Sequence, residues 1–167
     1  ASDSTGRKET LRILPPKEIV DVSLSKEKSK PFDTCYELQG ELGRGGFSTV
    51  RQGTKKDHKE TFAIKCIDKI YKNGHHRTSE DSQELRVTVL EEVHILKELS
   101  HKSIIRLNDF FDEPSMYYLV MENMSGGELF DRIVLKQSYN EADARDLIYT
   151  LLGAINHLHE RSIAHRD

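Results

Sequence analysis

Residues 42–50 are the first stretch of the chain whose composition could do chemistry. They read Leu-Gly-Arg-Gly-Gly-Phe-Ser-Thr-Val and separate two segments that alternate as β-strands do. Glycine has no Cβ, so such a turn can approach a ligand closely, and its successive N–H groups can face an anion. The pattern therefore indicates a phosphate-binding turn, while an ordinary glycine-rich hairpin fits the same residues.

Two charged residues stand where the surrounding pattern is apolar. Lys65 lies on an apolar face of a strand expected at 60–67, and Glu92 lies on the apolar stripe of a helix expected at 85–99. Buried charges need an opposite partner, so we predict that the two side chains form one ion pair. The alternatives are that Lys65 reaches water from a strand edge and that Glu92 stays solvated at the rim of its stripe.

The second half of the sequence supplies a hinge and a long helix. Paired glycines at 126–127 follow an expected strand at 116–121, which favours a linker there. Asn140 is a good N-cap for an apolar helix expected at 140–160, and the last three residues read His-Arg-Asp. The remaining expectations are strands at 35–42, 49–54 and 104–111, a polar loop at 72–84 and a short helix at 128–135.

Length and composition exclude several classes of protein. The 167 residues allow one compact domain or part of a larger one, and the net charge of −3 does not favour nucleic acid or an anionic membrane as partner. No apolar run approaches the ~20 residues of a membrane span. Cys35 and Cys66 are too few for a disulfide framework, which fits a reducing compartment.

In this order, the features closely resemble the signature of eukaryotic protein kinases: glycine turn, Ala-Ile-Lys strand, helix with an inward Glu, Gly-Gly hinge, long apolar helix and His-Arg-Asp. Residues 43–50 and 126–133 are similar to the calcium/calmodulin-dependent group of Ser/Thr kinases. Checkpoint-type and phosphorylase-kinase-type kinases are near neighbours by the same motifs. The glycine turn leads into a strand and not a helix, which argues against P-loop and Rossmann enzymes.

The resemblance implies an α+β, protein kinase-like fold. Its N-lobe is a five-stranded antiparallel sheet with one helix, and the first helices of a truncated helical C-lobe follow. We expect a flexible N-terminal extension at 1–31, the N-lobe with its hinge at 32–123, and the start of the C-lobe at 124–167.

The resemblance also implies the roles of individual residues. Lys65 would contact the ATP phosphates, Glu92 would hold Lys65, and Asp167 would accept the proton of the substrate hydroxyl. The glycine turn would cover the phosphates, an apolar roof and a gatekeeper would enclose adenine, and the hinge would bind its edge. The expected ATP-binding residues are Leu42, Gly43, Arg44, Gly45, Gly46, Phe47, Ser48, Val50, Ala63, Lys65, Met121, Glu122, Met124 and Glu128.

The implied function is ATP-dependent Ser/Thr protein kinase, favouring a basic residue upstream of the target. We expect Mg²⁺ with its ligands beyond Asp167, so the 167 residues alone should be inactive. Other expected partners are protein substrates with Ser or Thr, and calmodulin or another regulator that acts through segments not present in these residues. The expected location of the protein is the cytoplasm or the nucleus. The alternative is a truncated, non-catalytic module that binds nucleotide or partners and regulates another kinase.

Overall fold

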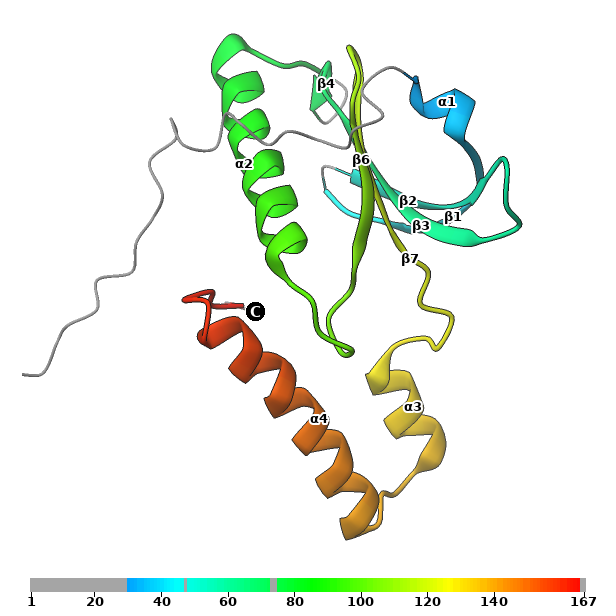
Figure 1. Ribbon diagram of the computed structural model, residues 1–167, viewed down its shortest axis with the longest axis vertical. Coiled ribbons are helices and arrows are strands. Elements are labelled where there is room, and N and C mark those ends of the chain that lie inside the picture. Colours follow the sequence, from blue (N-terminus) through cyan, green and yellow to red (C-terminus); the bar gives the residue numbers. More distant parts are fainter. Residues whose placement is uncertain (1–29, 47, 73–74, 166–167) are drawn as a thin grey trace, which may run out of the picture.

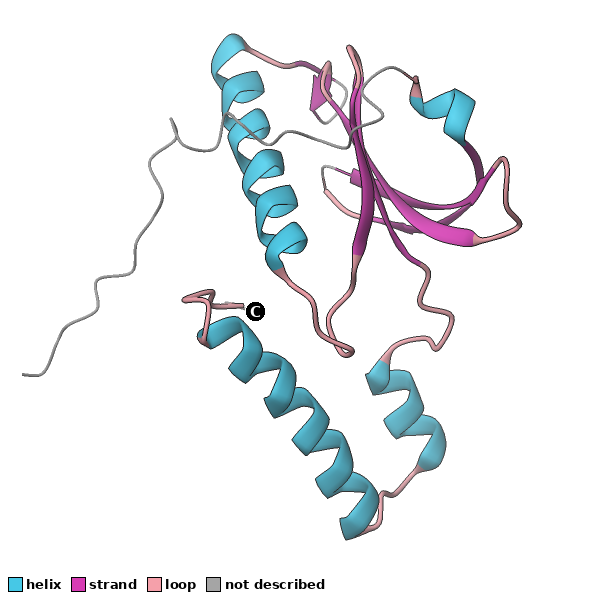
Figure 2. Ribbon diagram, in the orientation of Figure 1, coloured by secondary structure: helices cyan, strands magenta, loops and turns pink. Residues whose placement is uncertain are grey.

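The computed structural model describes residues 30–46, 48–72 and 75–165. A five-stranded antiparallel sheet in the order β1-β2-β3-β7-β6 forms one half, and two helices, α3 and α4, lie beyond its end (Figures 1 and 2). The strands are β1 (Tyr36–Arg44), β2 (Ser48–Lys55), β3 (Thr61–Asp68), β6 (Leu107–Asp112) and β7 (Met116–Glu122). The helices are α1 (Phe32–Cys35), α2 (Ser79–Glu98), α3 (Leu129–Lys136) and α4 (Glu141–His159). A small hairpin, β4 (Tyr71–Lys72) and β5 (His75–His76), precedes α2.

The central strand β3 separates two apolar clusters because alternate side chains point to opposite faces. On the inner face, Ile67 packs with Val89 and Val93 of α2. On the outer face, Ile64 and Cys66 pack in a cluster that includes aromatic residues from α1 and β1. The alternation predicted from sequence is confirmed, and it fixes which side chains of β3 can meet α2.

Helix α2 is longer than the sequence pattern predicted. It begins at Ser79, where Thr78 and Asp81 form a reciprocal capping box, and not at residue 85. The extra turns at residues 79–84 are polar, so the sequence shows no apolar periodicity there. The prediction of a loop at 72–84 was therefore wrong for residues 79–84, which are helical. The cap satisfies backbone N–H groups at the helix start and fixes where α2 begins.

A one-turn helix, α1, covers the outer face of the sheet and was not predicted. Phe32 is 4% exposed and stacks on Tyr118 with ring centroids 3.9 Å apart. Its backbone N–H also donates to Glu113 Oε1 at 2.6 Å. Cys35 ends this helix, so β1 starts one residue later than expected and the small lobe has α1 in addition to its one long helix.

The helices α3 and α4 follow the predicted boundaries closely. Asn140 caps α4 as expected, since its Oδ1 accepts the N–H of Asp143 at 2.8 Å. Within the described residues, Ala154 and Leu158 are the buried positions of α4, and Leu151 and Leu152 are about half exposed. None of the described helices has the length and apolar character needed to cross a bilayer.

We predict that Gly53→Ala destabilises the fold. A Cβ at Gly53 would overlap Ile64 Cδ1 in the outer cluster and would lie 3.1 Å from the Glu37 carbonyl oxygen. Because Ile64 is fully buried and cannot move away, the free energy of unfolding should fall by about 1–3 kcal/mol. Denaturant unfolding measures this. Gly40→Ala is the matched control, since its Cβ would meet nothing within 4 Å, and an equal loss in both variants would contradict the prediction.

Candidate functional site

The predicted ion pair between Lys65 and Glu92 is present. Lys65 Nζ lies 2.7 Å from Glu92 Oε1 and 2.8 Å from Oε2, and the two side chains are 26% and 33% exposed. A lysine ammonium has three N–H donors, and two of them are directed at the carboxylate. The third is available to an anion. The pair therefore holds a fixed positive charge in front of the inner face.

The register of the sheet places an apolar patch beside this charge. Val50 on β2 pairs directly with Lys65 on β3, and Ala63 pairs with Met121 on β7. Directly paired residues of antiparallel strands share a face. Ala63 and Met121 are 9% and 8% exposed. The inner face thus offers a flat apolar surface that ends at a lysine, which suits a heterocycle carrying phosphates.

The glycine turn closes over the same side of the sheet. The N–H of Gly45 donates to the carbonyl oxygen of Ser48 at 2.8 Å, which fixes the turn. Cβ atoms built at Gly43 or Gly46 would meet nothing within 4 Å, so the backbone is open to a ligand here. Phe47, one of the predicted residues, lies outside the described part of the chain.

A hollow of about 370 Å³ joins the turn to the ion pair. Its lining includes Gly46 and Ser48 of the turn and the Lys65–Glu92 pair. The charged residues Arg77, Asp81 and Glu84 also belong to this lining. A backbone turn facing an ammonium is the donor set that phosphate groups need. The turn and the Lys65 ammonium therefore offer donors to a phosphate group at one end of this hollow.

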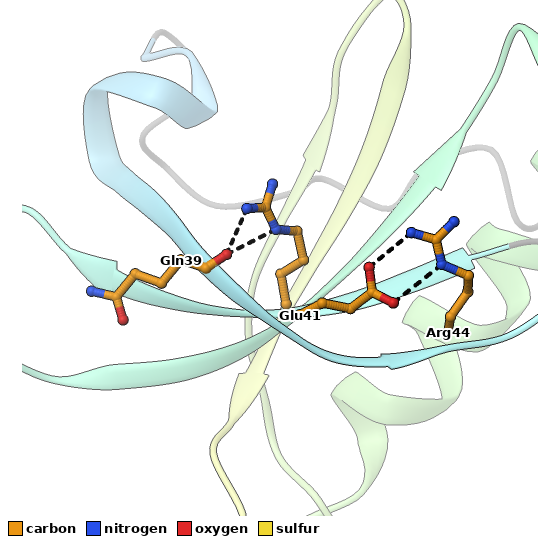
Figure 3. A network of polar contacts seen from close by, with 4 residues as sticks. Gln39, Glu41 and Arg44 are labelled. Atoms are coloured by element: carbon orange, nitrogen blue, oxygen red, sulfur yellow. Dashed lines mark hydrogen bonds and ion pairs between the residues drawn. The ribbon is translucent and has the colours of Figure 1, made fainter.

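Two of the predicted residues differ from the rest in their placement. The Arg44 side chain pairs with Glu41, with Nη2 and Oε2 2.8 Å apart (Figure 3). It also lines a second hollow, on the outer face. The hydrogen bond from Arg44 lowers the pKa of Glu41. Leu42 is 51% exposed on the edge strand β1. Only the backbone of Arg44 belongs to the glycine turn, because its side chain is paired with Glu41.

The segment after β7 has the features of a hinge. Glu122 is fixed at its start, because its N–H donates to the Arg106 carbonyl oxygen at 3.1 Å and its Oε1 accepts the Arg106 N–H at 3.0 Å. Met124 is 71% exposed, and its N–H has no hydrogen-bond partner in the described ranges. Gly127 has a φ of 73°, which favours glycine. Glu128, the N-cap of α3, has an exposed carboxylate that makes no cap hydrogen bond.

The structure does not place every predicted residue. Asp167 lies outside the described residues, as does Arg166. Within residues 30–46, 48–72 and 75–165, no group of three or more His, Cys, Asp or Glu side chains could hold a metal ion.

The sequence did not reveal a second set of ion pairs, centred on Asp112, that connects α2 to the sheet. Asp112 at the end of β6 pairs with Lys69 just past β3 and with Arg86 on α2, the latter with Nη1 and Oδ2 3.3 Å apart. These contacts join the helix to the sheet about two turns before Glu92, so they help to set its position. The three residues are charged positions in polar stretches, and no periodicity in the sequence connects them.

A small lobe in which a lysine–glutamate pair lies beside a glycine turn is characteristic of the protein kinase class. The family model described as "Protein kinase domain" matches residues 36–167. The chain belongs to this family.

Similar proteins agree with this assignment. Myosin light chain kinase A of Dictyostelium discoideum is 46% identical over 135 residues, which cover 81% of this chain and 43% of the relative. Calcium/calmodulin-dependent protein kinase type 1B of Rattus norvegicus is 37% identical over 144 residues, covering 86% and 39%. The chain thus spans about two fifths of the length of these relatives.

A solved structure shows the same fold. The crystal structure of Rad53 1-466 in complex with AMP-PNP matches with a TM-score of 0.66 and 29% identity, over 79% of this chain and 33% of that one. The expected kinase-like fold with a five-stranded antiparallel sheet is confirmed.

We predict that Glu92→Gln weakens nucleotide binding roughly tenfold, or ~1.4 kcal/mol. The amide cannot attract the Lys65 ammonium as a carboxylate does, so the charge in front of the inner face is held less firmly. Calorimetric titration with AMP-PNP measures the change. Glu91→Gln is the matched control, because Glu91 is the exposed neighbour on the same helix. The same affinity in both variants would refute the role of the pair.

Proposed function

We propose that this chain is the nucleotide-binding part of a Ser/Thr protein kinase, which transfers the γ-phosphoryl group of ATP to a protein hydroxyl. The observation that carries the proposal is the two-pronged contact between Lys65 and Glu92 beside an open glycine turn. Membership of the protein kinase family and the similarity to Ser/Thr kinases support it.

The inner face would contact ATP along the whole length of the nucleotide, from the phosphates to the adenine. Backbone N–H groups of the glycine turn would face the phosphates, and the third donor of Lys65 would reach the α- and β-phosphates. Val50 and Ala63, with Leu42 at the edge, would cover adenine. Met121 would stand at the back of the pocket, and the hinge at Glu122 and Met124 would bind the adenine edge by backbone groups.

The chemical step would use residues at the end of the chain. Asp167 would accept the substrate hydroxyl proton and orient the oxygen for in-line attack. When bound with ATP, Mg²⁺ neutralises charge on the phosphates. The described residues would contribute binding and orientation, since positioning and charge stabilisation supply most of the catalysis in phosphoryl transfer.

The isolated 167 residues are expected to bind ATP and to transfer no phosphate. Their sequence contains no Asp-Phe-Gly motif, which supplies a metal ligand in protein kinases. A radiometric assay on a Ser/Thr peptide, with Lys65→Met as the background, measures transfer, and Lys102→Met at an exposed loop position controls for loss of a lysine. Turnover above the Lys65→Met background would contradict this expectation. The intact protein from its natural source should transfer phosphate, and failure there would overturn the kinase proposal.

Glu128 would select substrates with an upstream basic residue. Its carboxylate is exposed beside the hinge and has no cap hydrogen bond, so it is free to pair with a substrate arginine. We predict that Glu128→Gln lowers the preference for upstream Arg roughly two- to fivefold.

A peptide array with the intact protein measures this preference. Asp131→Asn, one turn along the exposed surface of α3, is the matched control and should leave it unchanged. An intact protein that is indifferent to basic residues would rule out this role. Regulation by calmodulin, suggested by the names of the relatives, would act through segments other than the lobe described here.

A further inference from the structure

The outer face of the sheet carries a second hollow, which adjoins the glycine turn at Gly45, Gly46 and Ser48. It has a volume of about 590 Å³, and its lining includes Cys66, which alternates with Lys65 on β3 and so points to the opposite face. Tyr118 belongs to this lining and also stacks on Phe32 of α1. The hollow therefore adjoins the part of the outer face that α1 covers.

Two arginines in the lining form hydrogen bonds to backbone carbonyl oxygens and no ion pair with another described residue. Arg51 donates from Nε and Nη2 to the Gln39 carbonyl oxygen at 2.9 and 2.6 Å (Figure 3). Arg77 donates from Nε to the Asp68 carbonyl oxygen at 3.2 Å. Neither forms an ion pair with another described residue. Neutral acceptors thus hold both guanidinium groups in place, and neither group is committed to an ion pair with a described residue.

The carboxylates in the same lining are already engaged. Glu41 pairs with Arg44, so these two charges offset one another. Asp68 Oδ1 accepts the N–H groups of Ile70 and Tyr71 at 2.7 and 2.9 Å, which stabilises the turn after β3. The two carbonyl-held arginines are therefore the charges available to an incoming group.

Part of the lining is apolar, beside polar residues that include Ser48 and Thr49. Leu38, Cys66, Met116 and Tyr118 contribute side chains between the arginines. An occupant that satisfies the surface would carry carboxylates for the guanidinium groups and aliphatic side chains for the apolar part. A mobile inorganic anion would leave the apolar part uncovered.

The chain itself contains such a segment. Residues 18–24, outside the described ranges, read Glu-Ile-Val-Asp-Val-Ser-Leu, with two carboxylates, four aliphatic side chains and no Lys or Arg. Lysines flank it at 17 and 26. The seven residues from Ser25 to Pro31 can span up to about 23 Å, and α1 begins beside the hollow at Phe32. The segment is therefore tethered within reach of the hollow.

We propose that residues 18–24 bind in the outer-face hollow of the same molecule, with Glu18 and Asp21 paired to Arg51 and Arg77. The tether makes the association intramolecular, so modest contacts suffice to populate it. This surface would let the segment before the kinase domain contact the side of the sheet that faces away from ATP. The proposal is independent of the kinase activity.

A nitroxide label on the full 167-residue chain tests the contact. The label is placed at Ser23→Cys in a Cys35→Ser background, because Cys66 is buried and reacts slowly. Binding predicts paramagnetic broadening of the backbone amides of Cys66 and Tyr118. Combining Arg51→Glu with Arg77→Glu should reduce this broadening roughly tenfold.

A second pair of variants, made in the segment itself, keeps the test valid if the arginine substitutions disturb the structure of the hollow. Glu18→Arg with Asp21→Arg changes only the segment and should reduce the broadening equally, and the two pairs of reversals combined should restore it. Arg145→Glu, at an exposed position of α4, is the control and should have no effect.

Two results would overturn the proposal. If the broadening stays the same in the arginine variants and in the segment variants, the segment approaches the hollow without pairing its carboxylates with the arginines. Broadening seen on unlabelled chains mixed with labelled ones would place the segment in the hollow of a second copy. Broadening confined to the labelled molecule and sensitive to both reversals would support it.

Discussion

The ion pair between Lys65 and Glu92 is the interaction on which the site depends. It joins strand β3 to helix α2, and it holds the Lys65 ammonium beside the hollow next to the glycine turn. At a separation below 3 Å and partial exposure, such a pair contributes on the order of 1–4 kcal/mol. That is enough to couple the position of α2 to the affinity for an anion.

The two faces of the sheet have separate tasks because β3 alternates strictly. The inner face holds the lysine and the apolar surface for a nucleotide, and the outer face holds the aromatic cluster that anchors α1. Gly53 illustrates the constraint, since only a residue without a Cβ fits between Ile64 and β1. A shift of one residue in the pairing would exchange the two faces and remove the site.

Helix α2 is held at several points along its length. The capping box at Thr78 fixes its start, Asp112 ties Arg86 to the sheet, and Val89 and Val93 fill the space below it. Glu92 lies between Val89 and Val93 on the same helix, so these contacts help to place it opposite Lys65. Movement of the helix would therefore change the ion pair without changing either residue, which is how helix position can gate a kinase.

The sequence by itself determined the β3 alternation, the ion pair and the Asn140 cap, because each rests on a local pattern or on two anomalies that explain one another. The five-stranded antiparallel sheet was expected from the resemblance to protein kinases and not from periodicity. The sequence did not determine the start of α2, the one-turn helix α1 or the Asp112 ion pairs. Those depend on caps, aromatic stacking and charges that come together only in space, between residues up to about 80 positions apart such as Phe32 and Glu113. The placement of Arg44 and Arg51 on the outer face was likewise decided by strand register, a tertiary property that the glycine-rich pattern does not encode.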